Sequence, residues 1–394
     1  MVGRTTKAVV VGAGISGLAC ALRLRGFGIA SLVLEAGDRP GGTINTIRRD
    51  GFLFEAGPQC PRFPAALWNL VRRLNLQSEF VRGDAKLKRY ILRGGHLHPA
   101  PLSPLGLLLT HLVGARSKVR VLTEPFRSSC PPLAEETLAE FVQRKFGQEI
   151  LDNLVDPFVA TVFQGDPYKM GMQSALPALV GWERKSGSVV RGAIRARRSN
   201  RDKRAGFDPL ATPVSHGDTR GLNVTKALPT LGSFRSGMGR LPERLAEELS
   251  GYIQYKSAIE SVVPMREEAL PEGRWQVFLS DGRCITTEHL ILATPADVSA
   301  KLLASAIPRL SDRLRAIEYA PVCVTSFVYA RSTVANPLNG FGFMVPRGLG
   351  MRTTCTFWNS SLFPERAPKG KVLVTSFCSC GSGAGDEESF GGER

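Results

Sequence analysis

The chain has 394 residues, of which 43% are hydrophobic and 22% charged, and its 51 lysines and arginines outnumber 35 acidic residues to give a formal net charge of +16. This length supports two or three packed units, and the composition excludes an intrinsically disordered chain. The basic excess favours an anionic partner, such as a lipid surface, a nucleic acid or a carboxylate-bearing substrate, without choosing among them.

The first predicted element is a βαβ unit. Residues 7–11 form a short β-branched strand, and the strand leads directly into a glycine turn at residues 12–17. A helical pattern over residues 18–25 and a second strand at residues 31–34 follow. Because this strand begins a few residues after Met1, no signal or transit peptide is expected.

The spacing of three glycines in the turn predicts a dinucleotide site. Gly12 permits the tight turn, Gly14 lets the backbone approach a pyrophosphate, and Gly17 lets the helix pack closely on the strand. Glu35 stands at the end of the second strand, 21 residues after Gly14, where its carboxylate can accept from a ribose 2′-hydroxyl. The motif alone does not distinguish NAD from FAD.

The rest of the chain predicts a helical stretch followed by a mainly β region. Residues 101–204 are mostly helical in pattern, most clearly at 134–146 and 150–162, and residues 200–229 have the composition of a loop. The later predicted elements are a helix at 241–249, a hairpin of strands 275–279 and 284–287, and strands at 289–293, 322–330 and 371–377. The Gly-, Ser- and acid-rich residues 381–394 are expected to be disordered.

Two segments suggest contact with a membrane surface. The apolar patch from Leu102 to Val113 is too short to cross a bilayer but suits its interface. The stretch from Arg184 to Arg204 holds nine basic residues, and it is either a membrane-facing element or a solvated loop. No aromatic platform accompanies the charge, so no nucleic-acid role is expected.

No metal site or disulfide framework is predicted. The eight cysteines are scattered, and the one close pair, Cys378 and Cys380, has C-x-C spacing. Reduced thiols in a reducing compartment are therefore expected. His96 and His98 alternate on one predicted strand, and solvated or hydrogen-bonded histidines are the more common outcome of such a pair, so we assign them no role.

The residues after Glu35 resemble a family of flavoproteins. The stretch from Glu35 to Thr43 resembles the second phosphate-binding segment of the amine oxidase, phytoene desaturase and protoporphyrinogen oxidase flavoproteins, and Asp50 to Pro58 resembles their turn beneath the flavin ring. In that comparison Gly41 and Gly42 bring backbone amides to the pyrophosphate and Arg39 adds charge. The resemblance implies FAD as cofactor, held by Gly12, Ala13, Gly14, Ser16, Gly17, Glu35, Arg39, Gly41, Gly42, Thr43, Gly57, Pro58 and Ile259.

Seven later segments resemble the oxygen-dependent protoporphyrinogen oxidase family specifically. They are Lys88–Ile91, Phe141–Gly147, Val155–Phe158 with Gly165–Pro167, Gly181–Glu183 with Gly187–Ser188, Ser233–Met238, Gly340–Pro346 and Ser360–Gly370. The resemblance implies FAD-dependent oxidation of protoporphyrinogen IX to protoporphyrin IX by dioxygen, in haem and tetrapyrrole biosynthesis. Coproporphyrinogen III oxidation and a truncated, non-catalytic relative remain alternatives, and an amine oxidase or desaturase is disfavoured by these segments.

The same resemblance implies which residues meet the substrate. Arg89 matches the arginine that pairs with a propionate, and a guanidinium suits a carboxylate because it can donate two parallel hydrogen bonds. Met344 and Phe377 match apolar positions against the macrocycle, although surface or core roles would equally suit all three residues. Thr161 lines the same pocket where the family usually has glycine, and Gln164 and Cys355 likewise replace small residues.

The implied fold is α/β, with a Rossmann-like FAD-binding domain, a mixed-sheet α+β substrate domain and a helical membrane-binding insertion. The expected boundaries are 1–83 and 238–298 for the FAD-binding domain, 84–100, 205–237 and 299–377 for the substrate domain, 101–204 for the insertion and 378–394 for a disordered tail. The family continues beyond this point with a segment that completes the flavin site, so we expect a truncated chain that lacks the C-terminal part of the FAD-binding domain.

The implied partners are a tetrapyrrole, dioxygen and a membrane surface contacted peripherally, while a homodimer is left open. The expected location is the cytoplasmic face of a bacterial membrane, with an organelle inner membrane as the alternative.

Overall fold

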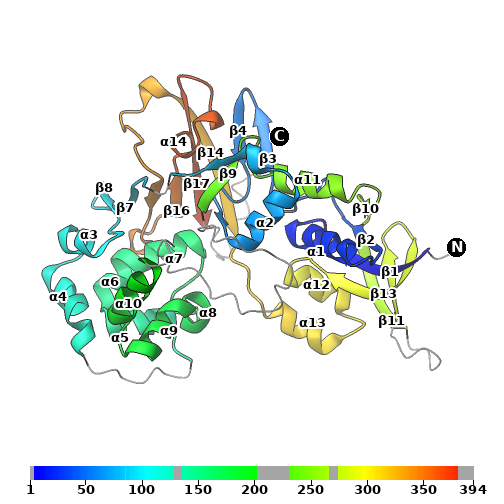
Figure 1. The fold of residues 1–394 in the computed structure, drawn as a ribbon, viewed down its shortest axis with the longest axis horizontal. Helices are drawn as coiled ribbons and strands as arrows, with labels where there is room; N and C mark the ends of the chain where they lie inside the picture. Colours follow the sequence, from blue (N-terminus) through cyan, green and yellow to red (C-terminus); the bar gives the residue numbers. More distant parts are fainter. Residues whose placement is uncertain (1–3, 85, 128–134, 202–229, 266–273, 380–394) are drawn as a thin grey trace. The chain divides into compact units, whose positions relative to one another are not determined.

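The computed structural model describes residues 4–84, 86–127, 135–201, 230–265 and 274–379 (Figure 1). These residues belong to two compact units, each built from discontinuous segments. The first unit takes its residues from Met1–Pro61, Leu70–Arg82 and Gly232–Tyr319, and the second from Arg62–Asn69, Gly83–Leu231 and Ala320–Arg394.

The first unit contains a six-stranded mixed sheet in the order β10-β2-β1-β13-β12-β11. Its strands are β1 (Arg4–Val11), β2 (Ser31–Leu34), β10 (Ile253–Gln254), β11 (Ile259–Met265), β12 (Arg274–Leu279) and β13 (Cys284–Leu292). β1 pairs in parallel with β2 and β13, whereas β11, β12 and β13 pair antiparallel. The two predicted strands at 284–287 and 289–293 are one continuous strand, because β13 pairs along its length with β1.

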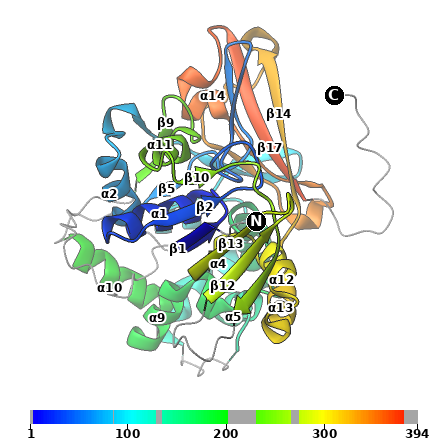
Figure 2. The same ribbon diagram turned by 90° about the vertical axis from the view of Figure 1, so that its right-hand side faces the viewer.

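The centre of this sheet forms one hydrophobic core of the first unit. Val9 and Val11 on β1 and Leu32 and Leu34 on β2 are buried in it, as expected for parallel strands covered on both faces. The helices of the unit are α1 (Ile15–Gly26), α11 (Arg240–Glu248), α12 (Ala296–Leu303) and α13 (Pro308–Arg315). α1 packs on β1 and β2 and against α11 (Figure 2). A separate hairpin joins β3 (Thr46–Arg49) to β4 (Phe52–Glu55).

The second unit contains another six-stranded mixed sheet, in the order β14-β17-β16-β15-β7-β8. Its strands are β7 (Arg89–Arg93), β8 (His96–Pro99), β14 (Val322–Ala330), β15 (Gly342–Met344), β16 (Thr353–Phe357) and β17 (Lys371–Ser379). Only β15 and β7 pair in parallel within this sheet. β17 extends two residues into the segment expected to be a disordered tail, since Cys378 and Ser379 pair with β14. The remainder of that tail lies outside the described residues.

Most of the described helices of the second unit lie between β8 and β9 (Thr230–Phe234) in sequence. They are α3 (Pro104–Leu109), α4 (Ala115–Thr123), α5 (Leu138–Lys145), α6 (Gln148–Ile150), α7 (Asp156–Val162), α8 (Met172–Ala175), α9 (Pro177–Ser186) and α10 (Val189–Arg201). A capping box between Thr137 and Glu140 starts α5. The predicted helix at 150–162 contains a π turn at Leu151–Val155. Pro157 explains it, because proline has no N–H to donate to the preceding turn.

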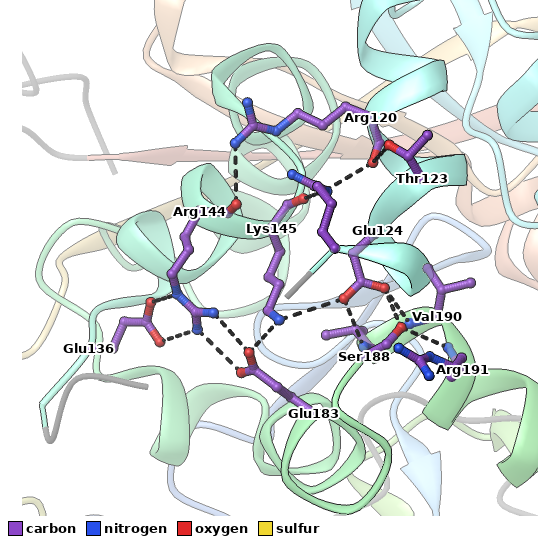
Figure 3. A network of polar contacts seen from close by, with 12 residues as sticks. Arg120, Thr123, Glu124, Glu136, Arg144, Lys145, Glu183, Ser188, Val190 and Arg191 are labelled. Atoms are coloured by element: carbon purple, nitrogen blue, oxygen red, sulfur yellow. Dashed lines mark hydrogen bonds and ion pairs between the residues drawn. The ribbon is translucent and has the colours of Figure 1, made fainter. Parts of the chain in front are cut away.

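A network of buried charges joins α5, α9 and α10 (Figure 3). Arg144 donates to both carboxylate oxygens of Glu136, at 2.6 and 2.8 Å, and to those of Glu183, at 2.8 and 3.2 Å. Lys145 Nζ lies 2.5 Å from Glu183 Oε1 and 3.7 Å from Glu124 Oε1. Because removing one partner leaves a buried charge uncompensated, these residues depend on one another.

The start of α10 completes this network. The buried carboxylate of Glu124, in the 3-10 turn Glu124–Phe126, accepts from the hydroxyl of Ser188 and from the N–H groups of Val189 and Val190 at 3.0 and 3.2 Å. A carboxylate at this position satisfies donors that a helix start leaves open and complements the helix dipole. Figure 3 shows the link between Glu124 and the first turn of α10.

The two units differ in places from the expected domain boundaries. Residues 299–319, expected in the substrate domain, belong to the first unit together with α12 and α13. Residues 62–69, expected in the FAD-binding domain, belong to the second unit. The helices of residues 101–201 and the sheet of β7, β8 and β14–β17 are one unit, because α7 packs directly on β15 and β16. Most of the expected substrate-domain segment 205–237 lies outside the described residues.

Candidate functional site

The glycine turn between β1 and α1 is held in a conformation that larger residues would disturb. Gly12 has a φ of +99°, which side chains rarely adopt, and its N–H donates to Leu34 O at 2.8 Å. A Cβ on Gly17 would lie 2.0 Å from Gly12 O. Gly14 is different, since its φ is −65° and a Cβ there would meet no atom within 4 Å. The open space at Gly14 therefore lies at the start of α1.

The start of α1 is suited to a negatively charged group. Gly14 is the N-cap residue and contributes no side-chain hydrogen bond, and the first turn carries no acidic residue. The N–H groups at a helix start point outward and carry partial positive charge. Ser16 is exposed in this first turn. The geometry thus fits the phosphate role that the sequence predicts for this turn.

Glu35 joins the end of β2 to the glycine turn. Its Oε2 accepts from the N–H of Ala13 at 2.6 Å, and its Oε1 accepts from the N–H of Gly37 at 2.8 Å. Tyr255 lies close enough for the Glu35 charge to act on it: burial first, and then this carboxylate, raise the pKa of the phenol. Tyr255 could not be predicted as a neighbour of Glu35, because the two residues are 220 positions apart in the chain.

The second glycine segment lies beside the first. Gly41 N–H donates to Ala13 O at 2.8 Å, and Gly14 and Gly41 form an isolated parallel bridge. Gly41 and Gly42 have φ values of +107° and +57°, and a Cβ on Gly42 would approach Gly14 Cα to 3.5 Å. The two predicted phosphate-binding segments are therefore brought together by main-chain contacts.

Thr43 and Gly57 are also neighbours. A Cβ on Gly57 would lie 2.1 Å from Thr43 O, so only glycine fits without displacing the chain. Pro58 follows and is exposed. Ile259 begins β11 and packs against the core of the first unit. It comes two positions after Ser257, whose N–H donates to Glu35 O at 2.8 Å, which ties this segment to the glycine turn.

Arg39, which is expected to add positive charge near the pyrophosphate, binds main-chain carbonyl groups of its own loop. Its guanidinium donates to Gly42 O at 2.8 Å, Pro40 O at 3.2 Å and Ile44 O at 3.3 Å. The side chain therefore closes its own loop around the second glycine segment. The positive charge of Arg39 lies next to that segment, but its guanidinium N–H groups already donate to main-chain carbonyl groups.

A buried carboxylate that sequence reasoning did not single out supports the same region. Glu55, at the end of β4, accepts from the N–H of Met238 at 2.8 Å and from Thr46 Oγ1 at 2.7 Å. Thr46 Oγ1 in turn accepts from Gly239 N–H at 2.8 Å. These bonds fix the hairpin before Gly57 to the turn before α11. The sequence hinted at this contact only in that Glu55 and Met238 each lie in a segment that resembles the family.

The predicted cofactor residues thus fit a dinucleotide whose pyrophosphate lies at the α1 N-terminus. Two main-chain segments rich in glycine are joined at Ala13 and Gly41, and a cradle that a Cβ would fill remains open at Gly14. Glu35 lies at the same turn with further carboxylate lone pairs for ribose hydroxyls. This combination of backbone donors and a neighbouring carboxylate is the pattern of a Rossmann-like cofactor site.

In the second unit, three of the four predicted substrate residues converge on Cys355. Met344 and Cys355 are cross-strand partners on β15 and β16, and Cys355 pairs with Phe377 on β17. Thr161, on α7, contacts the buried Cys355 thiol. Burial raises the pKa of this thiol to about 11, although the hydroxyls of Thr354 and Thr161 oppose the increase.

Side chains larger than glycine fill this junction between α7 and β16. Gln164 has a φ of +50°, and its side-chain amide exchanges hydrogen bonds with Thr354 Oγ1 at 3.1 and 3.2 Å. The Thr354 hydroxyl is also 3.1 Å from Phe377 O. The Thr161 hydroxyl is buried without a partner in hydrogen-bond geometry, so its contact with Cys355 is a weak one.

Arg89 lies at the far side of this group on β7. Arg89 is the cross-strand partner of Gly342 on β15, and the guanidinium carbon of Arg89 is 4.7 Å from the ring centre of Phe341. Ring centres then follow at 5.6 Å from Phe341 to Phe357 and at 5.4 Å from Phe357 to Phe377. The four predicted substrate residues are therefore connected through one row of aromatic side chains and one cross-strand cluster.

Comparison with known proteins places these features in context. The family model described as flavin containing amine oxidoreductase matches residues 15–391. Protoporphyrinogen oxidase 1 of Arabidopsis thaliana is 31% identical over 390 residues, covering 95% of this chain and 69% of that protein. The chloroplastic enzyme of Nicotiana tabacum is 30% identical over 383 residues, covering 94% and 66%. The chain therefore spans slightly less than two thirds of the length of this tobacco relative.

Solved structures show the same fold. A provisionally named protoporphyrinogen oxidase from Exiguobacterium sp. 255-15 superposes with a TM-score of 0.74 at 23% identity, covering 96% of this chain and 77% of that one. Reduced UDP-galactopyranose mutase gives a TM-score of 0.66 at 18% identity, covering 96% and 75%. The predicted α/β class with a Rossmann-like domain and mixed sheets is confirmed.

Proposed function

The chain belongs to the flavin containing amine oxidoreductase family, with the protoporphyrinogen oxidases among its relatives, and on that premise we propose that it binds FAD and oxidises protoporphyrinogen IX to protoporphyrin IX with dioxygen as acceptor. The observation that carries this proposal is the junction of the two glycine segments at Ala13 and Gly41, with Glu35 bound to the same turn.

In this proposal the first unit holds the cofactor through backbone groups. The N–H groups at the start of α1 and the segment of Gly41 and Gly42 contact the pyrophosphate, while Glu35 accepts from the ribose. Glu55 acts indirectly, because it fixes the hairpin that leads to Gly57. The bound flavin supplies the redox chemistry, so the protein needs no nucleophile or metal of its own.

The second unit supplies the substrate contacts. Arg89 binds a propionate, and Met344 and Phe377 offer apolar surface to the macrocycle. Their connection through Cys355 and through the row Phe341, Phe357 and Phe377 supports a role as one surface. Thr161 adds bulk at this surface, which favours a flat ligand over one that needs a deep recess.

Spectroscopy of the purified chain with and without added FAD tests the proposal. We expect flavin absorption at near-stoichiometric occupancy and growth of porphyrin fluorescence when protoporphyrinogen is added in air. Coproporphyrinogen is the comparison substrate, and faster turnover of it would reassign the activity. A folded chain that binds FAD but oxidises neither compound would be a non-catalytic relative. Failure to bind FAD at saturating concentration would remove the enzymatic assignment.

We also propose that the second unit contacts a membrane peripherally through α3, α4 and the turn after them. The exposed large apolar side chains there, together with Leu102 just before α3, are Leu105, Leu108, Leu109, Val119, Leu122 and Phe126. Arg191, Arg195 and Arg198 are exposed on α10 and would add attraction to anionic lipid of about 1 kcal/mol each. Across the described residues, no helix has the length and apolar character to span a bilayer.

Co-sedimentation with vesicles of anionic and of zwitterionic lipid tests the membrane contact. Leu105→Asp with Leu109→Asp should abolish binding, because both side chains are more than 60% exposed and would insert into the interface. Ile317→Asp, at a half-exposed apolar residue of the first unit, is the matched control. Equal binding of the wild type and the double variant would contradict the proposal, as would binding that disappears in both variants.

A further inference from the structure

Two cysteines lie directly opposite each other on neighbouring strands of the second unit. Cys323 on β14 and Cys378 on β17 are cross-strand partners in an antiparallel pair whose register is unbroken from Val322 to Ala330. Opposed residues of such a pair project to the same face of the sheet, with Cα atoms about 4.5 or 5.5 Å apart. A disulfide needs a Cα separation of about 4.4–6.8 Å. The register of these strands therefore places the two cysteines within range of a disulfide bond.

Both thiols are free and half-buried, so a small oxidant in the solvent can reach them. Cys323 Sγ lies 3.9 Å from Thr325 Oγ1, and Cys378 Sγ lies 3.7 Å from Thr353 Oγ1. Because sulfur is a weak hydrogen-bond donor and acceptor, these contacts hold neither thiol strongly. The sulfur atoms can therefore turn toward each other about their Cα–Cβ bonds while the backbone stays in place.

A third cysteine on the next strand is a poorer partner for Cys378. Cys355 on β16 pairs with Phe377, because the register of β16 and β17 shifts between Thr353 and Cys355. It is also buried, and burial raises the pKa of its thiol to about 11. Since the thiolate is the reactive form, Cys355 reacts slowly near neutral pH. Cys323 is therefore the partner that strand register and solvent access both favour.

The pair lies at the edge of its sheet. β14 is the terminal strand, and among the described residues it pairs with β17 alone. Cys323 is the second residue of β14, close to Ala320, where the chain re-enters the second unit. Fraying starts at such ends and edges, because they have few buried contacts. A bond between Cys323 and Cys378 would fasten β14 where it begins, next to the proposed substrate residue Phe377.

We propose that Cys323 and Cys378 form a reversible disulfide when the reduced chain meets hydrogen peroxide, and that this bond clamps the edge of the second sheet. One thiolate attacks the peroxide and breaks its O–O bond, so the cysteine becomes a sulfenic acid and the released hydroxide takes up the thiol proton to give water. The other thiol attacks the sulfenic sulfur, the S–S bond forms and a second water leaves. The two thiols lose two electrons, and the peroxide gains them. A dithiol reductant reverses the bond by exchange.

Peptide mass spectrometry of the full chain, treated with hydrogen peroxide and digested without reductant, tests this pairing. We expect one cross-linked pair of peptides that contains Cys323 and Cys378, is lighter by two hydrogens than the reduced peptides, and is separated by dithiothreitol. Cys323→Ser and Cys323→Ala should both abolish it. Cys380→Ser, at the other cysteine close to Cys378 in the sequence, is the matched control and should leave the cross-link unchanged.

Thermal unfolding tests whether the bond acts as a clamp. The Tm of the oxidised wild type should exceed that of the reduced wild type by roughly 5 °C, because the closed loop restricts the unfolded chain. Peroxide should give no such rise in Cys323→Ser. Since each oxidised sample is compared with its own reduced form, a variant that is less stable than the wild type still gives a clear result.

Several outcomes would overturn the proposal. A bond from Cys378 to Cys355 or Cys380, or bonds formed only between chains, would contradict the pairing. Equal rates of bond formation in the folded chain and in urea would mean that the strands do not position the thiols. A bond without a rise in Tm would exclude the clamp. None of these measurements uses flavin or turnover, so their failure leaves the proposed function untouched, and failure of the proposed function leaves them untouched.

Discussion

Glu35 accepts a hydrogen bond from the backbone N–H of Ala13 at 2.6 Å, so the carboxylate that ends β2 is fixed to the turn that ends β1. Its second oxygen is fixed in the same way by Gly37 N–H, at 2.8 Å. The position of the carboxylate is therefore set by the main chain before any ligand arrives. Such preorganisation lowers the cost of binding the proposed cofactor, because little side-chain freedom would be lost on contact with its ribose.

The first prediction concerns this carboxylate. Glu35→Gln keeps only one acceptor oxygen in the side chain. Either Ala13 N–H or Gly37 N–H then faces the NH₂ group and loses its acceptor. The cost of an unsatisfied donor is about 1–3 kcal/mol, which corresponds to FAD binding weakened about 10- to 100-fold. Titration of the apoprotein with FAD, followed by flavin fluorescence, measures this. Glu247→Gln on the surface of α11 is the control, and an unchanged Kd for Glu35→Gln would contradict the assigned role.

The second prediction compares two glycines of one turn. Gly17→Ala places a Cβ 2.0 Å from Gly12 O, so the turn must shift, and both the Tm and FAD binding should fall. Gly14→Ala has an ordinary φ and meets no atom within 4 Å, so the Tm should stay near that of the wild type. The new methyl group would nevertheless occupy the space where the phosphate must approach, and FAD binding should be lost.

Thermal unfolding of the apoproteins and FAD titration distinguish these two effects. Gly181→Ala, in the interior of α9 with no atom within 4 Å of its Cβ, is the matched control and should leave FAD binding unchanged. If Gly14→Ala bound FAD as tightly as the wild type, the pyrophosphate would not lie at the start of α1. The contrast does not depend on turnover, so it tests the site even in a chain without activity.

The local elements of this fold could be predicted because their signals lie within a few residues. The turn from Gly12 to Gly17 follows its strand directly, and helix α11 begins within one residue of its predicted start. β13 was divided in two because its pairing with β1 is a long-range contact. The tail is expected to begin at Cys378 because the family resemblance ends at Phe377, whereas pairing with β14 keeps Cys378 in a strand.

The contacts that complete the sites could not be predicted for the same reason. Glu55 and Met238 are separated by 183 positions, and nothing in either segment specifies the other. Arg39 was assigned to the pyrophosphate from its charge, but local carbonyl groups compete for its donors. Residue type indicates what a side chain can bind, and packing decides which partner it finds.

The third prediction uses the buried thiol at the junction of α7 and β16. Burial raises the pKa of Cys355 to about 11, so at pH 8 about one thiol in a thousand is ionised. Cys355 should therefore resist iodoacetamide in the folded chain and react fully after denaturation. Cys284 and Cys323, which are only partly buried, provide the comparison within the same sample. Rapid labelling of Cys355, measured by peptide mass spectrometry, would mean that α7 does not cover β16 in solution.

The fourth prediction concerns the stability of the charge network in Figure 3 at low pH. Burial alone would raise the pKa of Glu183, but hydrogen bonds and charge from Arg144 and Lys145 outweigh it and hold the pKa below the ordinary value of 4.5. The folded state therefore binds this proton less tightly than the unfolded state. The stabilisation from Glu183 is complete above about pH 4.5 and is lost as the pH falls through the lowered pKa.

Hydrogen exchange of α5, α9 and α10 between about pH 6 and pH 3 should thus show these helices losing protection as Glu183 becomes protonated, once the intrinsic pH dependence of exchange is removed. Glu183→Gln should remove this dependence and cost about 3–5 kcal/mol near neutral pH, because Arg144 and Lys145 lose a buried counter-charge. Glu140→Gln, at the exposed capping box of α5, changes the same charge on a neighbouring helix turn and should leave the acid transition in place. If Glu183→Gln and Glu140→Gln had the same stability and the same acid transition, the network would contribute no more to stability than a surface contact does. The position of α10 would then have to depend on its apolar face alone.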